Sequence, residues 1–182
     1  LDTPGHVDFS AEMERTLQVL DYAILVISGA DGVQGHTKTL WRLLDKYQIP
    51  VFLFVNKMDQ NGTDKDKLIM ELKKQLEDGC IEFGQDKTEE FYDQIAMCDE
   101  TMMEYYLENG FLEEKQIKQA VKERKVFPCF FGSALKLDGI EEFLNGFLTY
   151  TIPPCYQEEF GAKVFKITRD DQGNRLTPVS YT

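Results

Sequence analysis

Two short, uninterrupted apolar segments constrain the fold of this chain most strongly. They are YAILVI at residues 22–27 and VFLFV at residues 51–55. Strands buried on both faces of a parallel sheet have this pattern, because neither face is lined with polar residues. A third segment, VFPCFF at residues 126–131, is similar, although Pro128 lacks a backbone N–H and indicates an edge strand or an irregularity. We therefore predict a sheet of mostly parallel strands.

Helical patterns separate the predicted strands. Residues 9–20, 40–47 and 140–148 place apolar side chains three and four positions apart, which gives each helix one apolar face. Strands that alternate with amphipathic helices are typical of an α/β layer architecture. The segment at about residues 64–125 is more charged and helix-rich, and we expect it to be a helical insert between two strands.

The composition changes near Pro154. The residues IPP end the preceding helical pattern, because proline does not continue a helix. AKVFKI then reads as a strand and DDQGN as a hairpin turn leading to a short second strand, after which Pro178 interrupts the pattern. We place a domain boundary here, with residues 1–153 in one domain and residues 154–182 at the beginning of another.

Composition narrows the classes of function. The chain has 182 residues, 42% of them apolar, which is sufficient for a well-buried globular domain. Its net charge of −12 repels bare nucleic acid at long range, so we expect no sequence-specific nucleic-acid binding by this chain. We see no membrane-spanning apolar run and no signal peptide. The four cysteines form no CxxC pair, and we expect reduced thiols in a cytoplasmic protein rather than a zinc site.

The first of three short motifs is DTPG at residues 2–5. A carboxylate such as that of Asp2 can hold a hydrated Mg²⁺ ion. Gly5 lets a backbone N–H approach a phosphate without interference from a Cβ atom. A tight turn fixed by Pro4 and Gly5 explains the same residues, and for this motif alone the turn is the better explanation.

The second motif, NKMD at residues 56–59, directly follows an apolar segment. The Asp59 carboxylate can accept hydrogen bonds from both the ring N–H and the exocyclic amine of guanine, a donor pair that adenine lacks. The aliphatic stem of Lys57 can cover the face of the base. Asn56 and Asp59 are also common turn residues, but three fixed positions after a strand favour the functional interpretation.

The third motif is GSAL at residues 132–135, after the third apolar segment. Small residues at a strand exit allow backbone N–H groups to point at a ligand carbonyl such as O6 of guanine, although most such triplets are simply loops. Each of the three motifs follows a predicted strand, and open α/β sheets bind ligands along the carboxyl edge of their strands. The three motifs together are therefore a specific set.

In this order, DTPGHVDF, NKMD and GSAL resemble the GTPase domain of translational GTPases. The resemblance is strongest to the elongation factor G group, and in particular to the tetracycline ribosomal-protection proteins. It extends to about residue 167, where GAKVFKI resembles the first strand of the β-barrel domain that follows in that group. It implies a P-loop-type α/β domain, GTP or GDP with Mg²⁺ as ligands, and the ribosome as partner of the full-length protein.

The resemblance also implies roles for individual residues. Asp2 would reach Mg²⁺ through water, and Gly5 would contact the γ-phosphate. His6 would position the attacking water when a ribosome activates hydrolysis. The guanine pocket would consist of six residues, namely Asn56, Lys57, Asp59, Ser133, Ala134 and Leu135.

Two features of the family have no counterpart in these residues. No GxxxxGKS/T loop, whose amides and lysine hold the phosphates, occurs in the sequence, and the first switch is also absent. We therefore expect the chain to begin at the second switch of a longer protein and to lack GTPase activity by itself. One alternative is a non-catalytic module that keeps the guanine pocket or only the fold. Another is a nucleotide kinase, for which no second phosphate-binding element is present.

Overall fold

The computed structural model describes residues 16–84, 87–155, 159–164 and 166–181. Three residues with predicted roles, Asp2, Gly5 and His6, lie outside this part of the chain, as does most of the helix expected at residues 9–20. No helix in the described part is both long enough and apolar enough to cross a membrane.

The chain divides into two compact units. The core unit comprises residues 22–152, and the terminal unit comprises residues 153–182 together with residues 1–21. Each unit is described by itself.

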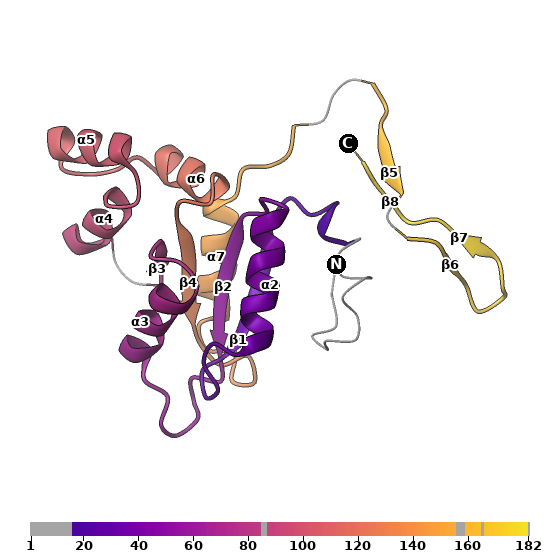
Figure 1. Cartoon of the computed structure of the whole chain (residues 1–182), viewed down its shortest axis with the longest axis horizontal. Coiled ribbons are helices and arrows are strands. Elements are labelled where there is room, and N and C mark those ends of the chain that lie inside the picture. The colour runs from indigo at the N-terminus through magenta and orange to yellow at the C-terminus, as the bar shows by residue number, and fades with distance from the viewer. Residues whose placement is uncertain (1–15, 85–86, 156–158, 165, 182) are drawn as a thin grey trace. The chain divides into compact units, whose positions relative to one another are not determined.

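A four-stranded parallel sheet forms the centre of the core unit, with strand order β1-β2-β4-β3 (Figure 1). The strands are β1 (Ala23–Ser28), β2 (Val51–Asn56), β3 (Cys80–Glu82) and β4 (Phe127–Phe131). All five apolar residues of β2 are buried, which agrees with its uninterrupted apolar sequence. The predicted α/β class with a mostly parallel sheet is confirmed.

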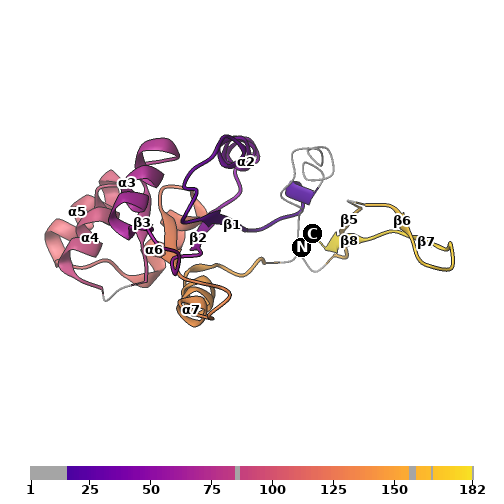
Figure 2. The same cartoon turned by 90° about the horizontal axis from the view of Figure 1, so that it is seen from below.

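Helices cover both faces of the sheet, and Figure 2 shows α2 and α3 on one side and α7 on the other. The helices of the core unit are α2 (Gly35–Lys46), α3 (Lys65–Gln75), α4 (Glu89–Ala96), α5 (Glu100–Asn109), α6 (Glu114–Lys122) and α7 (Ile140–Tyr150). On one face, Trp41 of α2 packs edge-on against Phe127, with ring centroids 4.7 Å apart. On the other face, Phe143 of α7 packs against Phe54 and Phe130.

Pro128 does not mark an edge strand, so the first of the two alternatives, an edge strand or an irregularity, is wrong. β4 lies inside the sheet, between β2 and β3. Its pairing with β2 begins only at Cys129, which is opposite Leu53. The residues on either side of Pro128 bond toward β3, because Phe127 N–H donates to Gly79 O and Cys129 O accepts from Phe83 N–H. The missing N–H of Pro128 therefore faces a part of the sheet where no ladder bond to β2 is required.

The helical insert contains a strand that the sequence patterns did not predict. β3 has only three residues, and it pairs with β4 through Cys80 opposite Phe127 and Glu82 opposite Cys129. The insert is therefore α3, then this edge strand, then α4, α5 and α6. A backbone turn after α6 brings the chain back into the sheet as β4.

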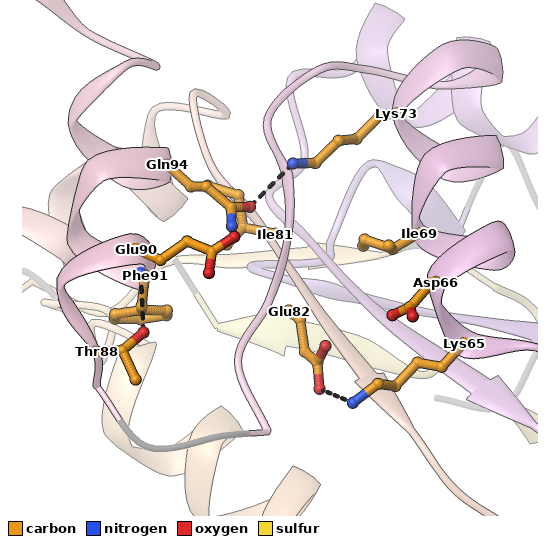
Figure 3. A pocket seen from close by; sticks show the side chains of 10 residues that line it. All are labelled: Lys65, Asp66, Ile69, Lys73, Ile81, Glu82, Thr88, Glu90, Phe91 and Gln94. Carbon is orange, nitrogen blue, oxygen red and sulfur yellow. Dashed lines mark hydrogen bonds and ion pairs between the residues drawn. The ribbon is translucent and has the colours of Figure 1, made fainter.

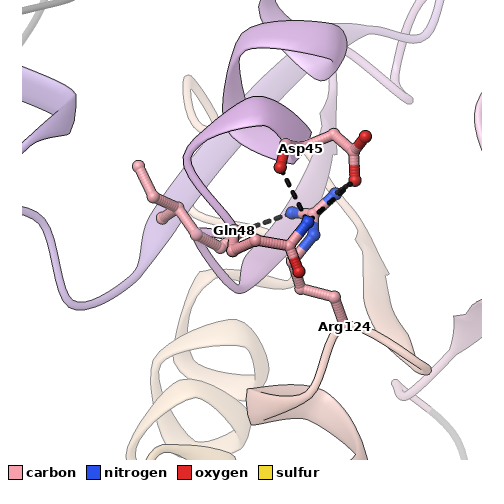
Figure 4. Close-up of polar contacts among 4 residues, drawn as sticks. Asp45, Gln48 and Arg124 are labelled. Atoms are coloured by element: carbon pink, nitrogen blue, oxygen red, sulfur yellow. Dashed lines mark hydrogen bonds and ion pairs between the residues drawn. The ribbon is translucent and has the colours of Figure 1, made fainter.

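Arg124 ties the end of the insert to the beginning of β2 (Figure 4). Its side chain is only 6% exposed. The guanidinium donates to the backbone carbonyl of Ile49 and to Asp45 Oδ1, the latter at 3.2 Å. It also lies over the rings of Trp41 and Phe127, 5.6 and 5.2 Å from their centroids. These contacts fix α2, β2 and β4 to one another at the amino ends of the strands.

β1 is the second edge of the sheet and is less covered than β2. Ile24 and Val26 are 47% and 59% exposed, although the same strand buries Leu25 and Ile27. The register places Ile24 beside Phe52 and Val26 beside Phe54. The uninterrupted apolar sequence of β1 therefore does not correspond to burial on both faces in the described structure.

The terminal unit is a two-part antiparallel ribbon. β5 (Ala162–Val164) pairs with β8 (Val179–Tyr181), and β6 (Thr168–Arg169) pairs with β7 (Arg175–Leu176). The predicted turn DDQGN connects β6 to β7, where Asp170 Oδ1 accepts hydrogen bonds from the N–H groups of Gln172 and Asn174. The predicted hairpin turn is confirmed, whereas the strand predicted for AKVFKI is described only at Ala162–Val164. Pro178 separates β7 from β8.

Candidate functional site

Asn56 joins the NKMD turn to the GSAL loop at the carboxyl edge of the sheet. It is the last residue of β2. Its side-chain Oδ1 accepts hydrogen bonds from the N–H groups of Lys57 at 2.7 Å and Ala134 at 2.9 Å. The two motifs, 78 residues apart at this bond, are therefore in direct contact. Parallel strands that end at one edge bring distant loops together in this way.

The backbone of the NKMD turn adopts an uncommon conformation. Lys57 has a φ of 65°, in the left-handed region that non-glycine residues rarely occupy. The next residue, Met58, donates its N–H to the carbonyl of Gly132 at 3.0 Å. Residues held in such conformations are concentrated at functional sites, because surrounding contacts must compensate for the strain. The exposed Lys57 side chain lies at the same turn.

The GSAL loop begins with a glycine that no other residue could replace without a backbone shift. A Cβ atom on Gly132 would lie 2.2 Å from the carbonyl oxygen of Asp138. The loop then closes on itself, because Ser133 N–H donates to Asp138 O at 3.0 Å and Asp138 N–H donates back at 3.1 Å. This closed loop fixes the residues between them, of which Leu135 is 90% exposed.

Ser133 contributes a buried hydroxyl to this edge of the sheet. The residue is only 1% exposed, and its Oγ makes no hydrogen bond to any described residue. Buried hydroxyls are normally paired, so an unpaired one at a sheet edge points to a missing partner. Ser28, which is beside Asn56 in the sheet register, also has an Oγ that is shielded from solvent and unpaired within the described structure.

Asp59 is ionised and faces the GSAL loop. Its side chain is 23% exposed, and its Oδ2 lies 3.4 Å from Nζ of Lys136. The nearby Ser133 hydroxyl is the largest influence that lowers the pKa of Asp59, followed by desolvation, which opposes it, and then by the local backbone and Lys136. Ser133 has no other side-chain partner among the described residues, and its hydroxyl is placed to favour the ionised Asp59 carboxylate.

The described structure therefore brings all six residues of the predicted guanine pocket to one edge of the sheet. Ala134 and Leu135 are exposed, and the N–H of Ala134 is already bound to Asn56. Lys136 belongs to the same group of residues, although the sequence patterns did not single it out. Its only signal was its position directly after GSAL.

The chemistry of this edge suits a flat ligand rich in N–H groups. An ionised carboxylate accepts two hydrogen bonds, a buried hydroxyl can donate or accept, and an aliphatic lysine stem can cover a ring face. The described residues contain no group of three or more histidine, cysteine, aspartate or glutamate side chains that could hold a metal ion. The predicted Mg²⁺ carboxylate, Asp2, lies outside the described residues.

A separate cleft of about 310 Å³ lies between α3, β3 and α4 (Figure 3). It contains none of the predicted site residues. Lys65 Nζ lies 2.7 Å from Glu82 Oε1, and Lys73 Nζ donates to Gln94 Oε1 at 2.9 Å. The two lysines of this cleft are therefore already paired with side chains of the cleft itself.

A parallel α/β sheet with an aspartate turn and a small-residue loop at its carboxyl edge defines a nucleotide-binding type of domain. The chain belongs to the family described as the elongation factor Tu GTP binding domain, whose model matches residues 1–153. This match places the chain in the translational GTPase class.

Known proteins resemble this chain in sequence and in fold. The mitochondrial ribosome-releasing factors 2 of Drosophila yakuba and Drosophila persimilis are each 29% identical, over 238 and 240 residues, and the matches cover 97% and 98% of this chain. The chain spans 33% of the length of these relatives. A crystal structure of a Thermus thermophilus protein matches 100% of this chain and 34% of the length of the Thermus protein, with a TM-score of 0.84 and 22% sequence identity. This similarity supports the fold.

Proposed function

We propose that this chain is the guanine-nucleotide-binding part of a translation factor that hydrolyses GTP on the ribosome. The observation that carries the proposal is the contact between the NKMD turn and the GSAL loop, which sets the Asp59 carboxylate beside the buried Ser133 hydroxyl. The family match supports GTP as the ligand. The names of the Drosophila relatives support the ribosome as the partner.

Three protein groups would recognise guanine: the Asp59 carboxylate, the Lys57 side chain and one backbone N–H of the GSAL loop. Asp59 would accept hydrogen bonds from the ring N–H and the exocyclic amine, while the Lys57 stem covers one face of the base. Because the N–H of Ala134 is bound to Asn56, the N–H of Leu135 would be the backbone donor for O6. Asn56 would then act by holding the two loops together rather than by contacting the base.

Hydrolysis would depend on residues outside the described part of the chain. Asp2 would hold Mg²⁺ through water, and the ion would neutralise charge on the phosphates. Gly5 would bring a backbone N–H to the γ-phosphate, and His6 would orient the attacking water. A second candidate function is a non-catalytic guanine-binding module, which would need only the joined NKMD and GSAL loops.

The experiment that tests guanine recognition is the substitution Asp59→Asn. Xanthine carries a carbonyl where guanine has its amine, so an amide can donate to it whereas a carboxylate is repelled. We expect the variant, in the full-length gene product, to prefer XTP over GTP by between about 10- and 100-fold, the reverse of the unmodified protein.

The matched control is Asp66→Asn, which changes an exposed aspartate of α3 in the same way. It should leave the preference for GTP unchanged. A retained preference for GTP in Asp59→Asn would refute the assignment of the pocket. Binding of GTP without ribosome-stimulated phosphate release would instead support the non-catalytic module.

A narrower role follows from the motif resemblance, namely that of a cytoplasmic tetracycline ribosomal-protection protein. Expression of the full-length gene in a tetracycline-sensitive bacterium tests it directly. The proposal predicts a raised minimal inhibitory concentration of tetracycline, which His6→Ala abolishes. An unchanged concentration would restrict the proposal to a translation factor without this activity.

A further inference from the structure

Lys136 occupies a defined position opposite the base-recognition carboxylate. Its Nζ lies 3.4 Å from Asp59 Oδ2. The backbone of Lys136 is held in place, because its N–H donates to the carbonyl of Ser133 at 3.1 Å within the loop closed by Ser133 and Asp138. The ammonium therefore approaches Asp59 from a fixed anchor, although its side chain is 63% exposed.

The Asp59 carboxylate has two oxygens, and guanine would use both of them. The ring N–H would bind one oxygen and the exocyclic amine the other, as in a bidentate pair. In the described structure, the lysine ammonium is next to one of these two acceptors. If the base lies with its exocyclic amine toward Oδ2, the amine and the lysine ammonium compete for that oxygen.

We propose that Lys136 is a specificity-determining residue, which occupies Asp59 Oδ2 in the free protein and is displaced by the exocyclic amine of guanine. This inference rests on the proposed guanine site. The base of inosine nucleotides has the ring N–H but no exocyclic amine, so it uses one oxygen and leaves the lysine in place. Lys136 therefore weakens the binding of guanine nucleotides while affecting inosine nucleotides less.

The size of the effect follows from the exposure of the pair. Ion pairs with exposed members are weak, because water and salt screen them, and their loss changes an equilibrium by at most about fivefold. Lys136 also attracts the phosphates of any nucleotide through its charge. Since GTP and ITP carry the same phosphates, that attraction cancels in the ratio of their dissociation constants.

The test is to measure the dissociation constants of GTP and ITP for the full-length gene product and for Lys136→Gln, at low and at high salt. We expect Lys136→Gln to raise the preference for GTP over ITP by about three- to fivefold at low salt. The gain should shrink at high salt, where the ion pair is already screened. Lys136→Arg, which keeps the positive charge, should retain the original ratio.

Lys122→Gln is the matched control, since it removes an exposed lysine from α6. It should leave the GTP-to-ITP ratio unchanged at both salt concentrations. An unchanged ratio in Lys136→Gln, in protein that still prefers GTP over XTP, overturns the inference and leaves the proposed function intact. Absence of any preference for GTP in the unmodified protein overturns the proposed function itself.

Discussion

Replacement of Arg124 by alanine should destabilise the core unit more than any single surface contact would suggest. The guanidinium is 6% exposed, and it is the partner of the Ile49 carbonyl, whose residue is only 3% exposed. It also covers the rings of Trp41 and Phe127. Arg124→Ala removes all of these contacts at once and leaves a polar carbonyl without its donor.

The magnitude can be estimated contact by contact. An unpaired buried carbonyl costs roughly 1–3 kcal/mol, and loss of the two cation–π contacts adds about 1 kcal/mol. The bond to Asp45, whose side chain is 64% exposed, contributes less than about 1 kcal/mol. Burial lowers the pKa of Arg124, which shows that the charged side chain is itself desolvated, and its removal relieves part of that cost. We expect a net loss of about 2–3 kcal/mol in the free energy of unfolding.

Trp41 provides the assay. It is the one tryptophan of the chain, it is 7% exposed, and its ring lies in the same cluster as Arg124. Urea unfolding followed by tryptophan fluorescence therefore reports on the part of the protein that the substitution affects. For a loss of this size we also expect the melting temperature to fall by about 5–10 °C.

Two further variants distinguish the loss of the buried carbonyl's donor from the loss of the exposed ion pair with Asp45. Arg42→Ala removes an exposed arginine from α2 and should change the free energy of unfolding by no more than about 0.5 kcal/mol. Asp45→Asn weakens only the exposed ion pair and should cost less than about 1 kcal/mol. If Arg124→Ala costs no more than Arg42→Ala, the reasoning about the buried carbonyl is refuted. If Asp45→Asn costs as much as Arg124→Ala, the ion pair rather than the carbonyl carries the stability.

Three other predictions concern packing, pH and catalysis. Gly146→Ala would place a Cβ atom 2.3 Å from the Phe130 ring, and we expect urea unfolding to show a loss of about 1–3 kcal/mol despite the higher helix propensity of alanine. Lys125 Nζ lies 2.7 Å from the Asp99 carboxylate, and its hydrogen bond lowers the pKa of Asp99. The ionised carboxylate therefore stabilises the fold at any pH above the unfolded pKa of about 3.9. This stabilisation is lost as the pH falls through the lower pKa of the folded state. Asp99→Asn should therefore be less stable than the unmodified protein at pH 7, and unfolding measured between pH 7 and pH 3 should show the difference shrinking. His6→Ala in the full-length gene product should lower ribosome-stimulated phosphate release by at least about 100-fold with GTP affinity changed only a few-fold, because the proposed role acts on the attacking water.

Each of these has a control or a contrary outcome. Gly35→Ala is the control for Gly146→Ala, because nothing lies within 4 Å of the Cβ atom that it adds, and it should be neutral or stabilising. Equal stabilities for the two variants would contradict the close packing of α7 on Phe130. A difference between Asp99→Asn and the unmodified protein that stays constant to pH 3 would remove the ionised carboxylate as its cause. Undiminished hydrolysis by His6→Ala at saturating ribosomes would remove His6 from the chemical step.

Most of the sheet was predictable from local sequence, and its exceptions have physical causes. The uninterrupted apolar segments became β1, β2 and β4, although β1, at the edge of the sheet, leaves Ile24 and Val26 exposed. β3 was missed because three residues flanked by charged segments give no period to detect. The position of Pro128 was misjudged because the cost of a missing N–H depends on which neighbour that N–H would face, and the pairing register alone sets this.

In the candidate site, the features that the sequence determines differ clearly from those that the tertiary structure determines. The sequence alone determined which residues the motifs supply, because strand ends, turn formers and small residues are local features. Only the tertiary structure decided that Asn56 binds the N–H of Ala134, and that Lys136 stands against Asp59. These contacts join residues from opposite ends of the insert, and they exist because β2 and β4 are neighbours in a parallel sheet. Strand adjacency is set by the packing of the whole core, which no short stretch of sequence contains.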